Sequence, residues 1–169
     1  MTDFTPSAVS NWELQLHAIL PLFGHRNWIV VADSAYPAQA KPGIETIVAA
    51  EDQLHVVRTV FDAIAASSHI RANVYVDEEL GFVAENDASG ITEYRRQLDA
   101  MLHGPNLKHH PHEQIIQRLD QFAQAFRILV IKTNMTIPYT SVFFELDCGY
   151  WDSGAEERLR RVMLVPDMR

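Results

Sequence analysis

The chain has 169 residues, of which 47% are apolar and 21% charged, an ordinary composition for one globular domain with its own core. Its formal net charge of −8 argues against DNA or an anionic membrane surface as a partner, because both attract a basic face. Cys148 is the only cysteine, which excludes an intrachain disulfide and a cysteine-based zinc site.

The N-terminal sequence "MTDFTPSAVSNWELQ" lacks the basic start and apolar centre of a signal peptide. No apolar run approaches the roughly 18 residues of a transmembrane helix. We therefore expect a cytoplasmic protein. Trp12, Leu16 and Ile19 then follow the spacing of one helix face, and Pro21 predicts a kink or an end to that helix.

The first half of the chain alternates short apolar runs with amphipathic segments. The run "WIVVA" at 28–32 is typical of a strand covered on both faces, and "IETIVAA" is a second strand candidate. Between them, "AYPAQAKPG" contains two prolines and a glycine and predicts a loop. From Glu51 to Ser67 the spacing predicts a helix whose core-facing stripe is formed by four residues: Leu54, Val57, Phe61 and Ile64.

The second half continues the same alternation. Strands are predicted at "ANVYVDEEL" and 106–110, and helices at 89–104 and from Pro111 onward, with Ile115, Leu119, Phe122 and Phe126 as the apolar stripe. Two strands, "RILVIKT" and "YTSVFFEL", follow with a turn around Pro138 between them. We expect a domain over 1–148 and a polar C-terminal extension over 149–169.

Helices that alternate with short apolar strands predict an α/β fold with a mostly parallel sheet. Ligands of such sheets bind beyond the carboxyl ends of the strands, where Asp33 is placed. His25 precedes the same strand, about 20 Å of extended chain away. Each residue also has a structural interpretation: His25 as the end of a helix, Asp33 as a turn former, and Tyr139 as a packed turn aromatic.

The order of these pieces resembles the D-ribose pyranase / L-fucose mutarotase family. The matching features are Gly24-His25, the apolar strand, Asp33 eight positions after the histidine, and the proline loop. Further on come "TEYRRQLDAML", "PHEQIIQRLDQFAQAF" and "RILVIKTNMTIPYTSVFFEL". The resemblance covers about residues 10–148 and implies a single three-layer α/β/α domain.

The resemblance also implies a function and a site. Catalytic roles fall on His25 and Asp33, and substrate-binding roles on His112, Tyr139 and Ser141, which stands where the family usually has asparagine. The implied partner is a free monosaccharide, and the implied assembly is a ring of identical subunits that share their sites. Interconversion of anomers or ring forms needs acid–base groups and no metal or other cofactor.

Two other functions compete with the mutarotase or pyranase. Ser141 has one hydroxyl in place of an amide's donor and acceptor, which favours a non-catalytic sugar-binding protein on the same scaffold. The cluster "KHHPHE" offers His109, His110, His112 and Glu113 as ligands for zinc. Anomer-exchange measurements, sugar-binding calorimetry and metal analysis separate the three.

Overall fold

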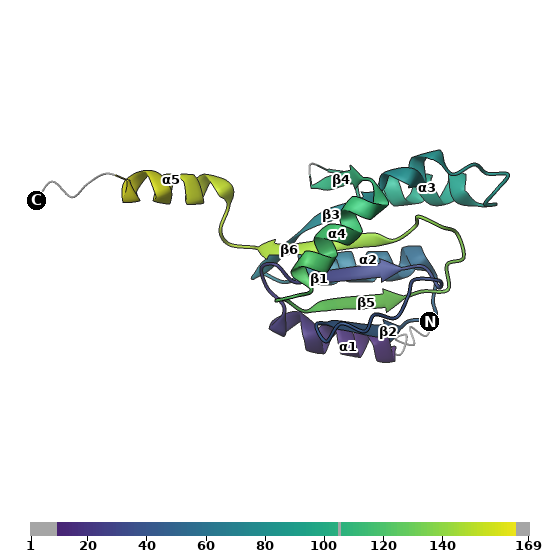
Figure 1. The fold of residues 1–169 in the computed structure, drawn as a ribbon, viewed down its shortest axis with the longest axis horizontal. Coiled ribbons are helices and arrows are strands. Elements are labelled where there is room, and N and C mark those ends of the chain that lie inside the picture. The colour runs from purple at the N-terminus through teal and green to yellow at the C-terminus, as the bar shows by residue number, and fades with distance from the viewer. Residues whose placement is uncertain (1–9, 105, 165–169) are drawn as a thin grey trace, which may run out of the picture.

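The centre of the computed structural model, which describes residues 10–104 and 106–164, is a sheet of six strands (Figure 1). Along the sheet the strands follow the order β2-β5-β1-β6-β3-β4. Their bounds are β1 Trp28–Ala32, β2 Ile44–Val48, β3 Ile70–Asp77, β4 Leu107–His110, β5 Ile128–Lys132 and β6 Val142–Cys148.

Five of these strands point the same way. β5 is parallel to both β1 and β2, and β3 is parallel to β4. β6 lies between β1 and β3 and is antiparallel to both. The predicted mostly parallel sheet is confirmed, and its one reversed strand is the one that returns directly after β5.

Helices cover both faces of the sheet and make three layers. Their bounds are α1 Asn11–Ile19, α2 Gln53–Ala65, α3 Ile91–Met101, α4 His112–Phe122 and α5 Ser153–Met163. The side chains of α1, α2 and α3 share one core with the sheet, whereas α4 alone packs in the other, on the near side of the sheet in Figure 1. Residues of β1 alternate between the two cores, so all five are buried.

Several helix boundaries and one core stripe differ from the prediction. α1 ends at Ile19 and continues as a 3₁₀ turn over Leu20–Leu22, as Pro21 requires. In α2, Val57 and Ile64 are buried as predicted, but Leu54 and Phe61 are only half-buried. Three other residues complete the buried face of that helix: Gln53, Val56 and Val60. Leu54 and Phe61 still pack against the same core, so the predicted stripe was incomplete.

The C-terminal part of the described chain extends away from the domain (Figure 1). α5 has no buried residue, and its Leu159, Val162 and Met163 are exposed. The structure does not describe residues 165–169 of the expected extension. It also does not describe residues 1–9, on which the expectation about the N-terminus partly depends. Among the helices that are described, none has the length and apolar character needed to cross a membrane.

Candidate functional site

The carboxyl ends of the five co-directed strands meet at one edge of the sheet. Asp33 directly follows β1, Asp77 ends β3, and His112 follows β4 after a single proline. β6 starts at this edge because it runs in the opposite direction, so the turn that carries Tyr139 and the buried Ser141 also lies here. Four of the five predicted site residues are therefore brought to one place.

A hollow of about 550 Å³ opens at this edge between the loop after β1, the start of α4 and the turn before β6. That volume lies within the range of small-molecule sites. The lining includes Asp33, Tyr36, Gln39, His112, Glu113 and Tyr139. No lysine or arginine is among the lining residues, all of which belong to the described part of the chain.

Asp33 is held by the loop that it starts. Its Oδ1 accepts a hydrogen bond from the backbone N–H of Ala35 at 2.9 Å, which closes a turn of the kind that aspartate favours. Its Oδ2 lies 3.5 Å from the hydroxyl of Ser141, which is itself 2% exposed. Asp33 therefore forms a turn and also lines the hollow. Ser141 contacts Asp33 rather than the hollow itself.

His112 is the first residue of α4 and is fixed at both its backbone and its ring. Its backbone N–H donates to both carboxylate oxygens of Glu79, at 3.1 and 3.0 Å. Its Nδ1 lies 3.0 Å from Oδ1 of Asp77, whose side chain is fully buried. The ring edge faces Tyr139, with 5.8 Å between the ring centroids. The imidazole therefore reaches the hollow in one defined orientation.

The protonation of this pair follows from its surroundings. The hydrogen bond with Asp77 raises the pKa of His112 above the ordinary 6.5, and burial opposes the rise only in part. Burial raises the pKa of Asp77, although the hydrogen bond with His112 acts in the other direction. A histidine hydrogen-bonded to a carboxylate is a group of the kind that acid–base chemistry uses.

Two tyrosines complete the lining. Tyr139 has a φ of 59°, a left-handed backbone conformation that is costly for a residue with a Cβ. It follows Pro138 in the turn, and this conformation directs the chain so that the ring meets His112. Tyr36 is 6% exposed, and burial, together with nearby carboxylates, raises its pKa to about 12. Its hydroxyl thus stays protonated and has no hydrogen-bond partner among the described residues.

His25 lies at the opposite edge of the sheet, before the start of β1. The five residues of β1 separate it from Asp33 by about 16 Å, at roughly 3.3 Å per residue. Its Nδ1 pairs with Asp147 at 3.0 Å, and Arg71 holds the other oxygen of that carboxylate at 2.8 Å. The side chain of His25 is 58% exposed. Within one chain, His25 does not join the other four predicted residues.

Three residues at this edge, Asp77, Glu79 and Tyr36, were not predicted from the sequence. The sequence did indicate the first two, because "VDEE" places acidic residues at the carboxyl end of a predicted strand. Asp33 has the same position relative to its own strand. Nothing local indicated that the strand ending in Asp77 would lie across from the helix starting at His112. That contact depends on the pairing of β3 with β4, where Asp77 is opposite His110.

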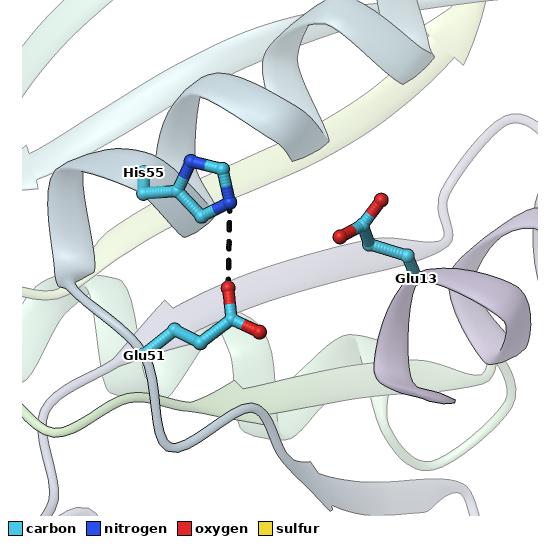
Figure 2. A group of neighbouring side chains, drawn as sticks. All are labelled: Glu13, Glu51 and His55. Atoms are coloured by element: carbon cyan, nitrogen blue, oxygen red, sulfur yellow. Dashed lines mark ion pairs between the residues drawn. The ribbon is translucent and has the colours of Figure 1, made fainter. Parts of the chain in front are cut away.

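A different cluster gathers potential metal ligands. Among residues 10–104 and 106–164, one group of three lies with its ligand atoms within 4.8 Å of one another: Glu13, Glu51 and His55 (Figure 2). It includes none of the residues at 109–113 that suggested zinc. Glu51 pairs with His55 at 3.3 Å and accepts a hydrogen bond from Trp12 at 2.9 Å. These contacts give the group a structural role, since they tie α1 to the start of α2.

Comparisons with known proteins identify the family. Among solved structures the chain is similar to Bacillus subtilis RbsD complexed with D-ribose, at 18% identity and a TM-score of 0.53, over 79% of this chain and 91% of that one. It is also similar to the fucose mutarotase in complex with L-fucose from Streptococcus pneumoniae, at 14% identity and a TM-score of 0.53, over 86% and 98% of the two chains. These likenesses show the fold. No curated protein has a significant match.

The family model described as the RbsD / FucU transport protein family matches residues 12–148, the stretch from α1 to the end of β6. The match covers most of the chain and agrees with the resemblance found in the sequence motifs. The chain therefore belongs to the RbsD / FucU family.

Proposed function

We propose that this protein is a mutarotase or pyranase that interconverts the anomers or ring forms of a free monosaccharide. The observation that carries the proposal is the grouping of Asp33, His112 and Tyr139 around one hollow at the carboxyl edge of an RbsD / FucU fold. The two similar structures support the substrate class, since one is complexed with D-ribose and the other is a fucose mutarotase in complex with L-fucose.

The reaction needs two proton transfers. A base takes the proton from the anomeric hydroxyl, the bond between the anomeric carbon and the ring oxygen breaks, and an acid protonates the ring oxygen. The anomeric carbon becomes an aldehyde carbonyl. Rotation about the adjacent bond and reversal of these steps gives the other anomer, and attack by a different hydroxyl gives the other ring size. Acid–base help of this kind typically contributes about 10²–10⁴-fold.

His112 is suited to the base in its neutral form. With the Nδ1 proton directed to Asp77, the unprotonated nitrogen is Nε2, which takes the anomeric proton. Asp33 and the hydroxyl of Tyr139 are suited to hydrogen bonds with the sugar hydroxyls, because both residues line the same hollow. The acidic lining favours an uncharged sugar over a phosphorylated one.

His25 belongs to the proposal through a neighbouring subunit. It lies too far from the hollow of its own chain, so we propose that in a ring of identical subunits His25 reaches the hollow of the next copy, where it supplies the second proton-transfer group.

Anomer exchange measured by NMR saturation transfer tests the function on a panel of free aldoses that includes D-ribose and L-fucose. We expect acceleration for at least one sugar, and a loss of about 10²-fold or more in Asp33→Asn, His112→Asn and His25→Ala. His112→Asn is preferred to alanine because asparagine still offers a donor to the buried Asp77. A folded protein that accelerates no sugar contradicts the proposal.

The second candidate is a monosaccharide-binding protein without catalysis. Ser141 favours this candidate, because its hydroxyl lies 3.5 Å from Asp33 and makes only a long, weak contact. The asparagine usual in the family has a larger amide side chain at this position. Calorimetry separates the two functions: sugar binding with no gain in exchange rate selects the binding protein.

A further inference from the structure

Among the described residues, Asp77 is the one carboxylate that bonds to the ring of His112, and it is also the most buried acidic group at the site. It ends β3, is 1% exposed, and places Oδ1 3.0 Å from Nδ1 of the histidine. Its Oδ2 is buried and has no hydrogen-bond partner among the described residues. A buried carboxylate with one unpaired oxygen lowers the stability of the fold, so its presence at the site indicates a functional role.

The geometry around His112 leaves the ring little freedom. Glu79 holds the backbone N–H with both oxygens, and the edge of the ring faces Tyr139. The two carboxylates come from the end of β3 and from the 3₁₀ turn that follows it. Because they fix the backbone and one ring nitrogen, the ring cannot turn over without losing its contact with Asp77. The remaining nitrogen, Nε2, is the one left for chemistry.

We propose that Asp77 is a positioning residue that holds His112 in the Nδ1–H tautomer, so that Nε2 acts as the base in the sugar hollow. The inference rests on the proposed function for its role in catalysis, but the tautomer and the contact can be tested without any sugar. A carboxylate that orients a histidine in this way fixes its tautomer and stabilises the imidazolium that forms when the base takes its proton.

Other charged groups also face His112, and all are acidic. Glu79 lies below the start of α4, Glu113 follows in that helix, and Asp33 approaches Asp77 from the end of β1. The charges of Glu79 and Glu113 favour the protonated ring, whereas Asp33 acts on Asp77. Among the described residues, Asp77 alone bonds to a ring nitrogen of His112. Removing Asp77 therefore changes both the tautomer and the pKa of His112, whereas removing Glu113 removes a nearby charge and no hydrogen bond to the ring.

The test is a pH titration of the His112 imidazole in ¹⁵N-labelled protein, followed by long-range ¹H–¹⁵N NMR. In the wild type we expect the neutral ring to be the Nδ1–H tautomer, with a pKa above that of an ordinary histidine. In Asp77→Leu, which removes the acceptor, we expect the Nε2–H tautomer to appear and the pKa to fall. Asp77→Asn should lower the pKa of His112 while changing the shape of the side chain less than leucine does. Glu113→Gln is the matched charge control, for which we expect a smaller shift in the pKa of His112 and an unchanged tautomer.

Two results overturn the inference. One is a wild-type ring in the Nε2–H form, which needs no variant to be folded. The other is a titration of Asp77→Leu or Asp77→Asn that coincides with that of the wild type. Failure of the proposed function has a different signature, since the wild type would then accelerate no sugar while the NMR result stands.

If the wild type is active, kinetics adds a further measurement. We expect Asp77→Asn to lower kcat for anomer exchange about tenfold or more with little change in KM, because the base is weakened while the sugar contacts remain. The acid limb of its pH–rate profile should move to lower pH, in step with the pKa of His112. An unchanged profile contradicts the positioning role.

Discussion

At the scale of single residues, His112 and Asp77 couple the proposed chemistry to stability. The pKa of His112 is raised by its hydrogen bond with Asp77, so protonation is more favourable in the folded protein than in the unfolded chain. This contribution is full below the ordinary pKa of 6.5 and is lost as the pH rises through the folded value. The pKa of Asp77 is raised by burial and acts with the same sign in a lower pH range.

As the pH rises through the folded pKa of His112, the free energy of unfolding should therefore fall more in the wild type than in Asp77→Asn. The variant lacks the carboxylate that raises the pKa of His112, and this part of the pH dependence disappears with it. Urea unfolding at a series of pH values measures the difference. Parallel profiles for the two proteins would show that the pair contributes nothing to the pH dependence of stability.

At the scale of elements, a buried polar network fastens the segment before β6 to the start of α2. Gln53 is fully buried, donates to the carbonyl of Thr140 at 2.6 Å, and accepts a hydrogen bond from the hydroxyl of Thr133. Tyr94 donates to the same Thr140 carbonyl at 2.7 Å. This network holds both ends of the segment that presents Tyr139 to the hollow.

Gln53→Leu should lower the free energy of unfolding by about 1–3 kcal/mol, because the buried groups of Thr133 and Thr140 lose a partner. Tyr94→Phe is the control: it removes one of two donors to the same carbonyl and should cost about 1 kcal/mol. Urea unfolding measures both. A Gln53→Leu variant as stable as the wild type would mean that the network does not hold the segment.

At the scale of the whole molecule, the two ends of the strands carry different functional groups. The hollow with Asp33, His112 and Tyr139 occupies the carboxyl edge, whereas His25 and the Arg71–Asp147 pair occupy the opposite edge. A head-to-tail ring would bring these two edges together, which is the arrangement that the proposed sharing of sites requires. α5 lies outside this core, beyond the stretch that matches the family.

A chain that ends after Gly149 should unfold at the same urea concentration as the full chain. None of the α5 residues is buried, so their removal costs the domain no core contact. Circular dichroism during urea unfolding measures the midpoint. A loss of more than about 1 kcal/mol would show that the extension contributes to the stability of the domain rather than standing apart from it.

Much of the fold could be predicted because it is encoded locally. The run 28–32 is a strand buried on both faces, and the stripe with Ile115 and Leu119 lies on α4, where both side chains are buried. Pro21 ended α1 for the same local reason. Boundaries were less predictable, since Phe126 continues the α4 pattern in sequence but lies past the end of the helix at Phe122.

The sequence by itself determined the alternation of helices and strands, the family, and the residue types that suit acid–base work on a sugar. Only the tertiary structure decided which of these residues meet. Asp33, His112, Tyr139 and Ser141 come together because five strands end at one edge and β6 begins there, and His25 stays apart because β1 holds it at the other end. Side-chain periodicity is a property of neighbouring residues, whereas strand order and the Asp77–His112 contact depend on pairings between distant segments.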